Sequence, residues 1–419
     1  MSAVCLRLGH DHVVNIDDPI LPAAAHITGP HAGDLLRPVV EAAGGHLHSF
    51  RCTSVQYRPG SNLVARFRVE VSWHGGRPTK DTLVAATTKD GPPAGTVPVT
   101  ADTPAGSISV GVWRWPFDPA LPALGDAVRE SGLRRLLQEI GLLDDSVPVN
   151  IEVVAYRPIE RAVLRIRSGE QTLYVKIVRP ERASLMLYRY EHLRSHGLPV
   201  PTVIAADAGQ GWILLEELVG PTLRELIKSD APEWVEPSRF RRMVQDLAAC
   251  DPTGLPAVRS RILDAPIHAA MLASVLPSER SRLEHFGALM RVALNASNQR
   301  QTNVIHGDLH EGQVVIDQGR IAGLLDIDDV GPGDPIDDVI VPVGHLRYRA
   351  SVSSGNADRT TALADDLLRA FASDYSQADL AIGVGAVLIG VATSPFRLQR
   401  PDWPTSVARV LDLVEQTLD

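Results

Sequence analysis

The residues that could carry out chemistry are concentrated in one short stretch of the chain. Residues 305–339 read IHGDLHEGQVVIDQGRIAGLLDIDDVGPGDPIDDV and include Asp308, Gln313 and Asp326. Carboxylate and amide oxygens are the hard ligands that magnesium prefers. A carboxylate that is free of metal can accept a proton from a hydroxyl. We therefore assign metal binding to Gln313 and Asp326, and the role of general base to Asp308.

A predicted hairpin brings these residues together. The apolar runs at 314–316 and 321–325 have the length of short strands, and the Gln-Gly pair between them suits a tight turn. Such a hairpin places the residues before it next to those after it. We expect the segment around Asp308 and Gln313 to lie near Asp326 and Asp328.

Phosphoryl transfer requires a metal, a lysine on the phosphates, a positioned nucleophile and a base. Far upstream, the strand-like segment 172–176 reads TLYVK and ends at Lys176. The parts that a kinase needs are supplied, in sequence order, by Lys176, Asp308, Gln313 and Asp326. A lone Asp or Lys is usually a solvated surface group, so the prediction depends on the combination.

These motifs resemble the aminoglycoside phosphotransferase and choline kinase-like family, whose members have a protein-kinase-like fold. The match consists of His-Gly-Asp-Leu-His at 306–310, Asp-Ile-Asp at 326–328, Gly-Asp-Pro at 333–335 and the lysine strand ending at Lys176. It spans roughly residues 150–419. The resemblance implies an ATP- and Mg²⁺-dependent transfer to a hydroxyl of a small molecule.

The resemblance also implies roles for residues outside the catalytic loop. Lys176 would bind the nucleotide phosphates with Glu191 as its partner and Glu181 as a rival for that role. Glu216 and Leu218, in a hinge strand, would bind adenine through their backbone. His306 and Asp338 would support the loop, and Asp328 would be an acidic residue on the acceptor side.

Two departures from the family pattern bear on the function. Gln313 replaces the usual Asn, and the pair Gly312-Gln313 is similar to the bacterial maltokinase and glucosamine kinase-like branch, which has an N-terminal cap domain. The loop at 157–162, RPIERA, contains no glycine. Glycine lets a backbone approach a ligand closely, so phosphate binding by this backbone is in question.

An internal repeat connects the N-terminal region with the lysine strand. The triplet Tyr-Arg-Pro recurs at 57–59 and 156–158, with a leucine-rich helical stretch before each copy. Each copy then reaches a second strand that ends in a lysine, Lys89 or Lys176. We interpret the first copy as a degenerate duplicate of the nucleotide lobe, and residues 91–106, rich in Pro and Gly, as an irregular excursion.

These observations predict an α+β, protein-kinase-like bilobal fold with an extra N-terminal α+β cap domain. We predict the cap at residues 1–130, the nucleotide lobe at 131–220, and a mainly helical lobe with the catalytic loop at 221–419. The net charge of −9 argues against nucleic acid as a partner. The longest apolar run, 380–392, is too short for a membrane span, and three scattered cysteines indicate a reducing cytoplasm.

The acceptor is less defined than the reaction. We prefer a sugar or aminosugar because of the Gly-Gln variant and the extra domain. An aminoglycoside is the second candidate. A pseudokinase that binds nucleotide without turnover is the alternative from another class, favoured by the absent glycines and opposed by the complete set of Asp308, Gln313 and Asp326.

Overall fold

The computed structural model describes residues 16–103, 106–137, 147–229, 231, 234–296, 302–352 and 355–419. The chain divides into two compact units. The first consists of Met1–Trp115, Met271–Arg280 and Ser394–Val407, and the second of Pro116–Ala270, Ser281–Thr393 and Ala408–Asp419. The first boundary therefore falls at Trp115, earlier than the predicted residue 130.

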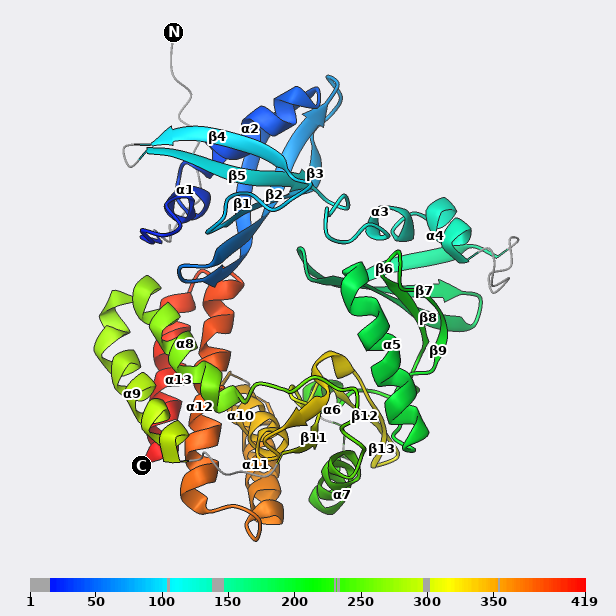
Figure 1. Ribbon diagram of the computed structural model, residues 1–419, viewed down its shortest axis with the longest axis vertical. Coiled ribbons are helices and arrows are strands. Elements are labelled where there is room, and N and C mark those ends of the chain that lie inside the picture. The colour runs from blue at the N-terminus through cyan, green and yellow to red at the C-terminus, as the bar shows by residue number, and fades with distance from the viewer. Residues whose placement is uncertain are drawn as a thin grey trace. The chain divides into compact units, whose positions relative to one another are not determined.

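The first unit contains two helices followed by a five-stranded antiparallel sheet in the order β1-β2-β3-β5-β4 (Figure 1). Its apolar residues alternate along β2 and β5 and fill the core, because successive strand residues point to opposite faces. The elements are α1 (Ala23–Thr28), α2 (Ala32–Ala42), β1 (Gly45–Arg58), β2 (Asn62–Trp73), β3 (Thr79–Thr88), β4 (Val97–Thr103) and β5 (Gly106–Arg114).

The second unit begins with the same arrangement, two helices and a five-stranded sheet in the order β6-β7-β8-β10-β9. One helix, α5, is inserted between β8 and β9 and lies against β9 and β10. The elements are α3 (Leu124–Ala127), α4 (Glu130–Leu137), β6 (Val149–Arg157), β7 (Arg161–Ser168), β8 (Gln171–Val178), α5 (Pro180–Ser195), β9 (Val203–Asp207) and β10 (Trp212–Glu216).

The shared strand order confirms the predicted topological repeat, and the register corrects one detail of it. Val163 pairs with Lys176 in the second sheet, and the equivalent Val64 pairs with Ala86 in the first. The counterpart of Lys176 is therefore the buried Ala86. Lys89 lies beyond the strand, is exposed and pairs with Asp90 at 2.8 Å.

The proline- and glycine-rich segment 91–106 is not wholly irregular, because residues 97–103 form β4. This strand lies at the edge of its sheet, where Pro98 faces Gly111 of β5. An edge strand tolerates proline, since the missing N–H need not bond to a further strand. The composition therefore concealed a strand.

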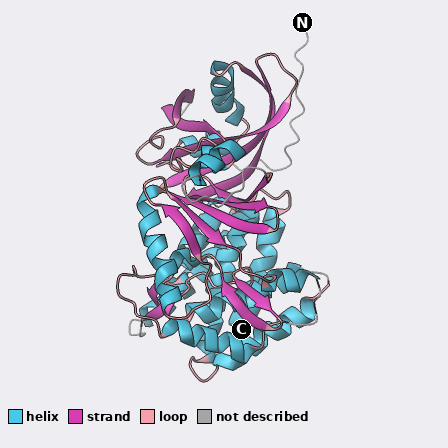
Figure 2. Ribbon diagram, turned by 90° about the vertical axis from the view of Figure 1, so that its right-hand side faces the viewer, coloured by secondary structure: helices cyan, strands magenta, loops and turns pink. Residues whose placement is uncertain are grey.

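Helices dominate the rest of the chain (Figure 2). They are α6 (Leu223–Ser229), α7 (Pro237–Ala248), α8 (Arg261–Val275), α9 (Arg280–Ala296), α10 (Asp337–Val352), α11 (Ala357–Phe371), α12 (Gln377–Arg397) and α13 (Trp403–Leu418), with short 3₁₀ turns η2 (Pro277–Glu279) and η3 (Ile327–Asp329). Helix α12 is long and apolar enough to cross a membrane, but 67% of its apolar window is buried in the protein. Packing in the core therefore accounts for its composition.

Two short antiparallel pairs hold the predicted catalytic segment. They are β11 (Asn303–Ile305) with β14 (Gly331–Gly333), and β12 (Val314–Asp317) with β13 (Arg320–Leu324). The second pair is the predicted hairpin. Gln318 and Gly319 form its turn, both with positive φ, as a two-residue hairpin turn requires.

Candidate active site

Lys176 faces two carboxylates from the distant segment after the hairpin. Its Nζ lies 3.2 Å from Asp326 Oδ1 and also contacts Asp328 Oδ1, although the two aspartates are about 150 residues further along the chain. Lys176 is only 4% exposed. A buried ammonium needs a partner of opposite charge, and these two carboxylates provide it.

Arg161, at the start of β7, contacts the same two carboxylates. Its Nη2 donates to Asp326 Oδ2 and its Nη1 to Asp328 Oδ2, each at 2.7 Å. Burial opposes the ionisation of Asp326, but Lys176 and Arg161 outweigh it and hold the pKa of this carboxyl below its usual range. Burial likewise opposes the charge on Lys176, and Asp328 reverses the effect, so the pKa of Lys176 is raised.

Gln313 and Asp326, the predicted metal ligands, lie side by side. The Gln313 amide nitrogen lies 3.4 Å from Asp326 Oδ2, and a half-turn of the amide would present its oxygen instead. Asp326 has a left-handed backbone (φ 51°), unusual for a residue other than glycine. One amide and one carboxylate oxygen are hard donors, so the residues present fit Mg²⁺ with water and phosphate completing the shell.

Asp308 lies in the loop before the hairpin, where its side chain is 34% exposed. Arg261, the first residue of α8, reaches it through Nη2 at 3.1 Å and also donates from Nε to the carbonyl of Gly307 at 2.8 Å. Gly307 has φ +78°, and a Cβ there would come within 2.9 Å of Val258. The glycine before Asp308 is therefore required for the shape of the loop.

Two buried residues connect the loop to its surroundings. Asp338, 1% exposed, accepts the backbone N–H groups of His306 at 2.7 Å and Gly307 at 3.1 Å. His306 is fully buried, and its Nε2 lies 2.9 Å from the carbonyl of Leu325, just before Asp326. These contacts fix the loop that carries Asp308 against the segment that begins at Asp326.

The turn before β7 is held by a residue that sequence reasoning did not single out. Asp118 accepts the hydroxyl of Tyr156 and the backbone N–H of Ile159, both at 2.8 Å. Ile159 has φ +58°, a conformation that disfavours β-branched residues. Burial raises the pKa of Asp118, and the N–H of Ile159 opposes that effect.

The first unit contains the same construction. Asp18 accepts the hydroxyl of Tyr57 at 2.9 Å and the backbone N–H of Gly60 at 2.7 Å. Asp18 and Asp118 each begin the sequence Asp-Pro-x-Leu-Pro-Ala. This six-residue repeat was the signal that could have found Asp118.

The predicted pairing of Lys176 with Glu191 is not present. Helix α5 buries Ala183, Met186, Tyr190 and Leu193, a spacing of three and four that leaves Glu191 exposed. Consecutive helix residues differ by about 100° in direction, so Tyr190 rather than Glu191 faces the lysine. Glu181 is also exposed and lies 3.9 Å from Arg179.

Asp328, predicted as an acidic residue on the acceptor side, has its carboxylate paired with Lys176 and Arg161. Its backbone carbonyl accepts Arg189 from α5, which also donates to the carbonyl of Val330 at 2.9 Å. Asp328 therefore connects the nucleotide lobe to the helical lobe.

The predicted hinge lies at the end of β10. Glu216 is exposed, and its backbone N–H donates to the carbonyl of Thr202 at 3.0 Å. The Leu218 side chain lies so close to Gly323 of β13 that a Cβ there would clash with it at 2.2 Å. Adenine binding by Glu216 and Leu218 stays a prediction.

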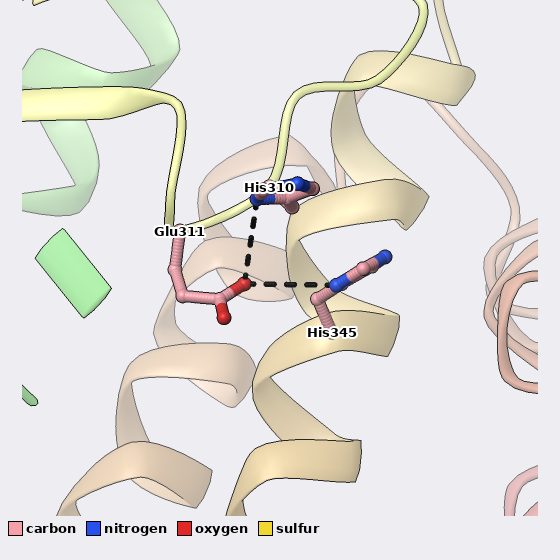
Figure 3. A group of neighbouring side chains, drawn as sticks. All are labelled: His310, Glu311 and His345. Atoms are coloured by element: carbon pink, nitrogen blue, oxygen red, sulfur yellow. Dashed lines mark ion pairs between the residues drawn. The ribbon is translucent and has the colours of Figure 1, made fainter. Parts of the chain in front are cut away.

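The buried carboxylate of Glu311 lies in the loop between Asp308 and β12, next to His310 and His345 (Figure 3). Glu311 accepts Arg224 of α6 at 3.0 Å and Arg349 of α10 at 2.7 Å. His310 and His345 stack on one another 4.8 Å apart, with their Nδ1 atoms 3.9 and 3.7 Å from Glu311 Oε2. Sequence reasoning missed this group, because its members come from three separate elements.

His310, Glu311 and His345 have the composition of a metal site, since their ligand atoms lie within 4.8 Å of one another. Burial lowers the pKa of both histidines to about 4, so at pH 7 they are neutral, the form in which imidazole binds a metal. The charges around them oppose a cation. The two arginines already exceed the single charge of Glu311, and His310 Nδ1 accepts the N–H of Gly312 at 3.0 Å. We interpret the group as a structural anchor.

The second unit has a five-stranded lobe with the buried Lys176, followed by a helical lobe with its partners Asp326 and Asp328. This arrangement is a protein-kinase-like fold. Residues 158–381 match the model of the phosphotransferase enzyme family, APH. This match spans more than half of the chain, so the chain belongs to the phosphotransferase enzyme family. As an enzyme it is a small-molecule kinase.

The solved structures that the chain resembles are distant in sequence. Aminoglycoside phosphotransferase APH(4)-Ia with ADP and hygromycin B is 13% identical over 68% of this chain and 97% of its own, with a TM-score of 0.48. Amicoumacin kinase hAmiN with AMP-PNP and Ca²⁺ is 16% identical over 70% and 95%, TM-score 0.49. APH(3'')-Id from Streptomyces rimosus is 20% identical over 61% and 96%, TM-score 0.42. No curated protein matches the chain.

Proposed function

We propose that the protein transfers the γ-phosphoryl group of ATP to a hydroxyl of a small molecule. The observation that carries the proposal is the pairing of the buried Lys176 with Asp326 across 150 residues. Kinase chemistry needs a phosphate-binding lysine beside a metal-binding carboxylate. A protein that only maintained its fold would gain little from burying these charges together.

The residues divide the work as follows. Asp308 orients the acceptor hydroxyl and accepts its proton, and Arg261, at 3.1 Å, holds the carboxylate in place. Lys176 neutralises phosphate charge. Gln313 and Asp326 would hold Mg²⁺, which supplies further neutralisation of the phosphates when bound. Glu216 and Leu218 would bind adenine at the hinge.

A sugar or aminosugar is our preferred acceptor, supported by the Gly312-Gln313 pair and the extra N-terminal unit. An aminoglycoside is the second candidate, favoured by the loop motif at 306–310. The net charge of −9 suits a cationic acceptor of either class and opposes nucleic acid. We also propose a cytoplasmic location, supported by the three scattered cysteines.

Nucleotide consumption with a panel of sugars, aminosugars and aminoglycosides tests this function. We expect turnover with at least one of them, and its loss in Asp308→Asn. Nucleotide binding without turnover on any acceptor would instead identify a pseudokinase. Phosphorylation of proteins in preference to all small molecules would contradict the proposal.

A further inference from the structure

We propose that the Arg161 side chain binds the nucleotide phosphates and replaces the glycine-rich backbone that residues 157–162 lack. The inference rests on the proposed kinase function and adds a phosphate-binding side chain to it.

The backbone of the turn before β7 is already committed. Pro158 has no N–H, Ile159 donates to Asp118, and Glu160 donates to the carbonyl of Arg157 at 3.1 Å. In protein kinases the corresponding loop covers the phosphates. Because these N–H groups are occupied within the protein, a side chain must supply the contact.

Arg161 is the side chain in position to do so. It is two residues from Val163, which pairs with Lys176, so Arg161 and Lys176 project from the same face of the sheet. Both reach Asp326. The phosphates that Lys176 neutralises therefore come within reach of Arg161.

The present partners of Arg161 show what it recognises. Its guanidinium is only 20% exposed and donates to one oxygen of Asp326 and one of Asp328. Its planar fork matches a pair of phosphate oxygens equally well. A divalent ion on Asp326 would repel the guanidinium, and the arriving phosphates would offer it new anionic partners. After this exchange the ion would compensate the charge of Asp326, and the phosphates would compensate the charge of Arg161.

The two sheets provide an internal comparison. The counterparts of Arg161 and Lys176 in the first sheet are Asn62 and Ala86. The fold thus forms without either cation. By contrast, the first sheet keeps the aspartate–tyrosine contact, as Asp18 with Tyr57. The first sheet thus keeps the contact that supports the turn but lacks both cations, which supports a functional rather than a structural role for the pair.

The test compares ligands with and without phosphate. Binding of adenosine, ADP and Mg²⁺–AMP-PNP is measured by calorimetry on the full chain, wild type and Arg161→Ala. We expect about 10- to 100-fold weaker Mg²⁺–AMP-PNP binding in the variant, the range for losing one or two charge-assisted hydrogen bonds. Adenosine binding should be unchanged. Arg161→Lys, which keeps the charge but not the fork, should be intermediate.

Arg167→Ala is the matched control, because Arg167 lies at the far end of β7 and is paired loosely with Glu152 at 3.7 Å. Its nucleotide affinity should equal that of the wild type. Unchanged Mg²⁺–AMP-PNP binding in Arg161→Ala, or equal losses for adenosine and AMP-PNP, would overturn the inference. If Arg161→Ala does not fold, Arg161→Lys decides by the same comparison. Failure of the wild type to bind any nucleotide would instead reject the kinase function.

Discussion

The carboxylate of Asp118 accepts the backbone N–H of Ile159 at 2.8 Å, and the equivalent Asp18 accepts the N–H of Gly60 at 2.7 Å. One construction thus supports two turns. The turn at Ile159 leads into the strand that pairs with Lys176, whereas the turn at Gly60 leads into the strand that pairs with Ala86. The two copies can therefore be used as controls for one another.

We predict that Asp118→Ala weakens Mg²⁺-nucleotide binding, whereas Asp18→Ala does not. Each substitution leaves a part-buried N–H without its partner, which costs up to about 1–3 kcal/mol of stability. Only Asp118→Ala also frees the turn that carries Arg161. Urea unfolding and nucleotide titration on both variants measure the two effects. Equal nucleotide affinities in the two variants would contradict a role for Asp118 in nucleotide binding.

Asp308→Asn should leave nucleotide binding nearly intact and lower turnover by about 10²–10⁴, the usual range for a general base. The reason is that, among the described residues, Asp308 forms its ion pair with Arg261 and not with Lys176. Turnover on the true acceptor and nucleotide affinity are the measurements. Near wild-type turnover would remove Asp308 from the mechanism.

Asp326→Asn should behave differently, because this carboxylate compensates Lys176 and Arg161 as well as binding the metal. We expect weaker Mg²⁺-nucleotide binding, lower turnover and a lower Tm. Calorimetric titration with and without Mg²⁺, together with thermal unfolding, tests this. A variant that binds Mg²⁺–AMP-PNP as tightly as the wild type would exclude Asp326 as a ligand.

Glu311→Gln should lower stability without removing a metal. Breaking a buried ion pair costs about 3–5 kcal/mol, and less where a partner is partly exposed, as Arg224 is. Asp374→Asn, which breaks the more exposed pair with Arg241, is the control and should have a small effect. Tm is measured with and without EDTA. A drop in the wild-type Tm on adding EDTA, in the absence of nucleotide, would support a metal site instead.

Asp337 makes stability depend on pH. Burial, followed by the charge of Asp334, raises the pKa of Asp337 to about 7, whereas an unfolded aspartate titrates near pH 3.8. Between these values the folded chain holds a proton that the unfolded chain has lost, so this contribution to stability falls as pH rises from about 4 to 7. Above pH 7 it is constant.

Asp337→Asn removes this dependence. The Tm of the variant minus that of the wild type should therefore increase from pH 4.5 to pH 7.5. Thermal unfolding of both proteins across that range measures it. A difference that is constant with pH would show that Asp337 titrates normally.

The sequence alone determined the fold class, the hairpin in the predicted catalytic segment and the topological repeat. The hairpin could be predicted because it is local, and its two strands and turn lie within a dozen residues. The repeat was visible because each copy has the same sequence pattern, a leucine-rich helix followed by a hairpin, at the same spacing. The six-residue repeat that begins at Asp18 and at Asp118 is also visible in the sequence and could have identified Asp118.

The tertiary structure decided which of these residues meet. Glu191 was predicted to face Lys176, but the rotation of α5 places Tyr190 there, and a helix is rotated by what it packs against. The pairing of Arg161 with Asp326, and of Glu311 with Arg349, joins elements that are far apart in the chain. Strand register, in turn, made Ala86 and not Lys89 the counterpart of Lys176. Such contacts depend on how separate elements pack, and local sequence patterns do not encode that packing.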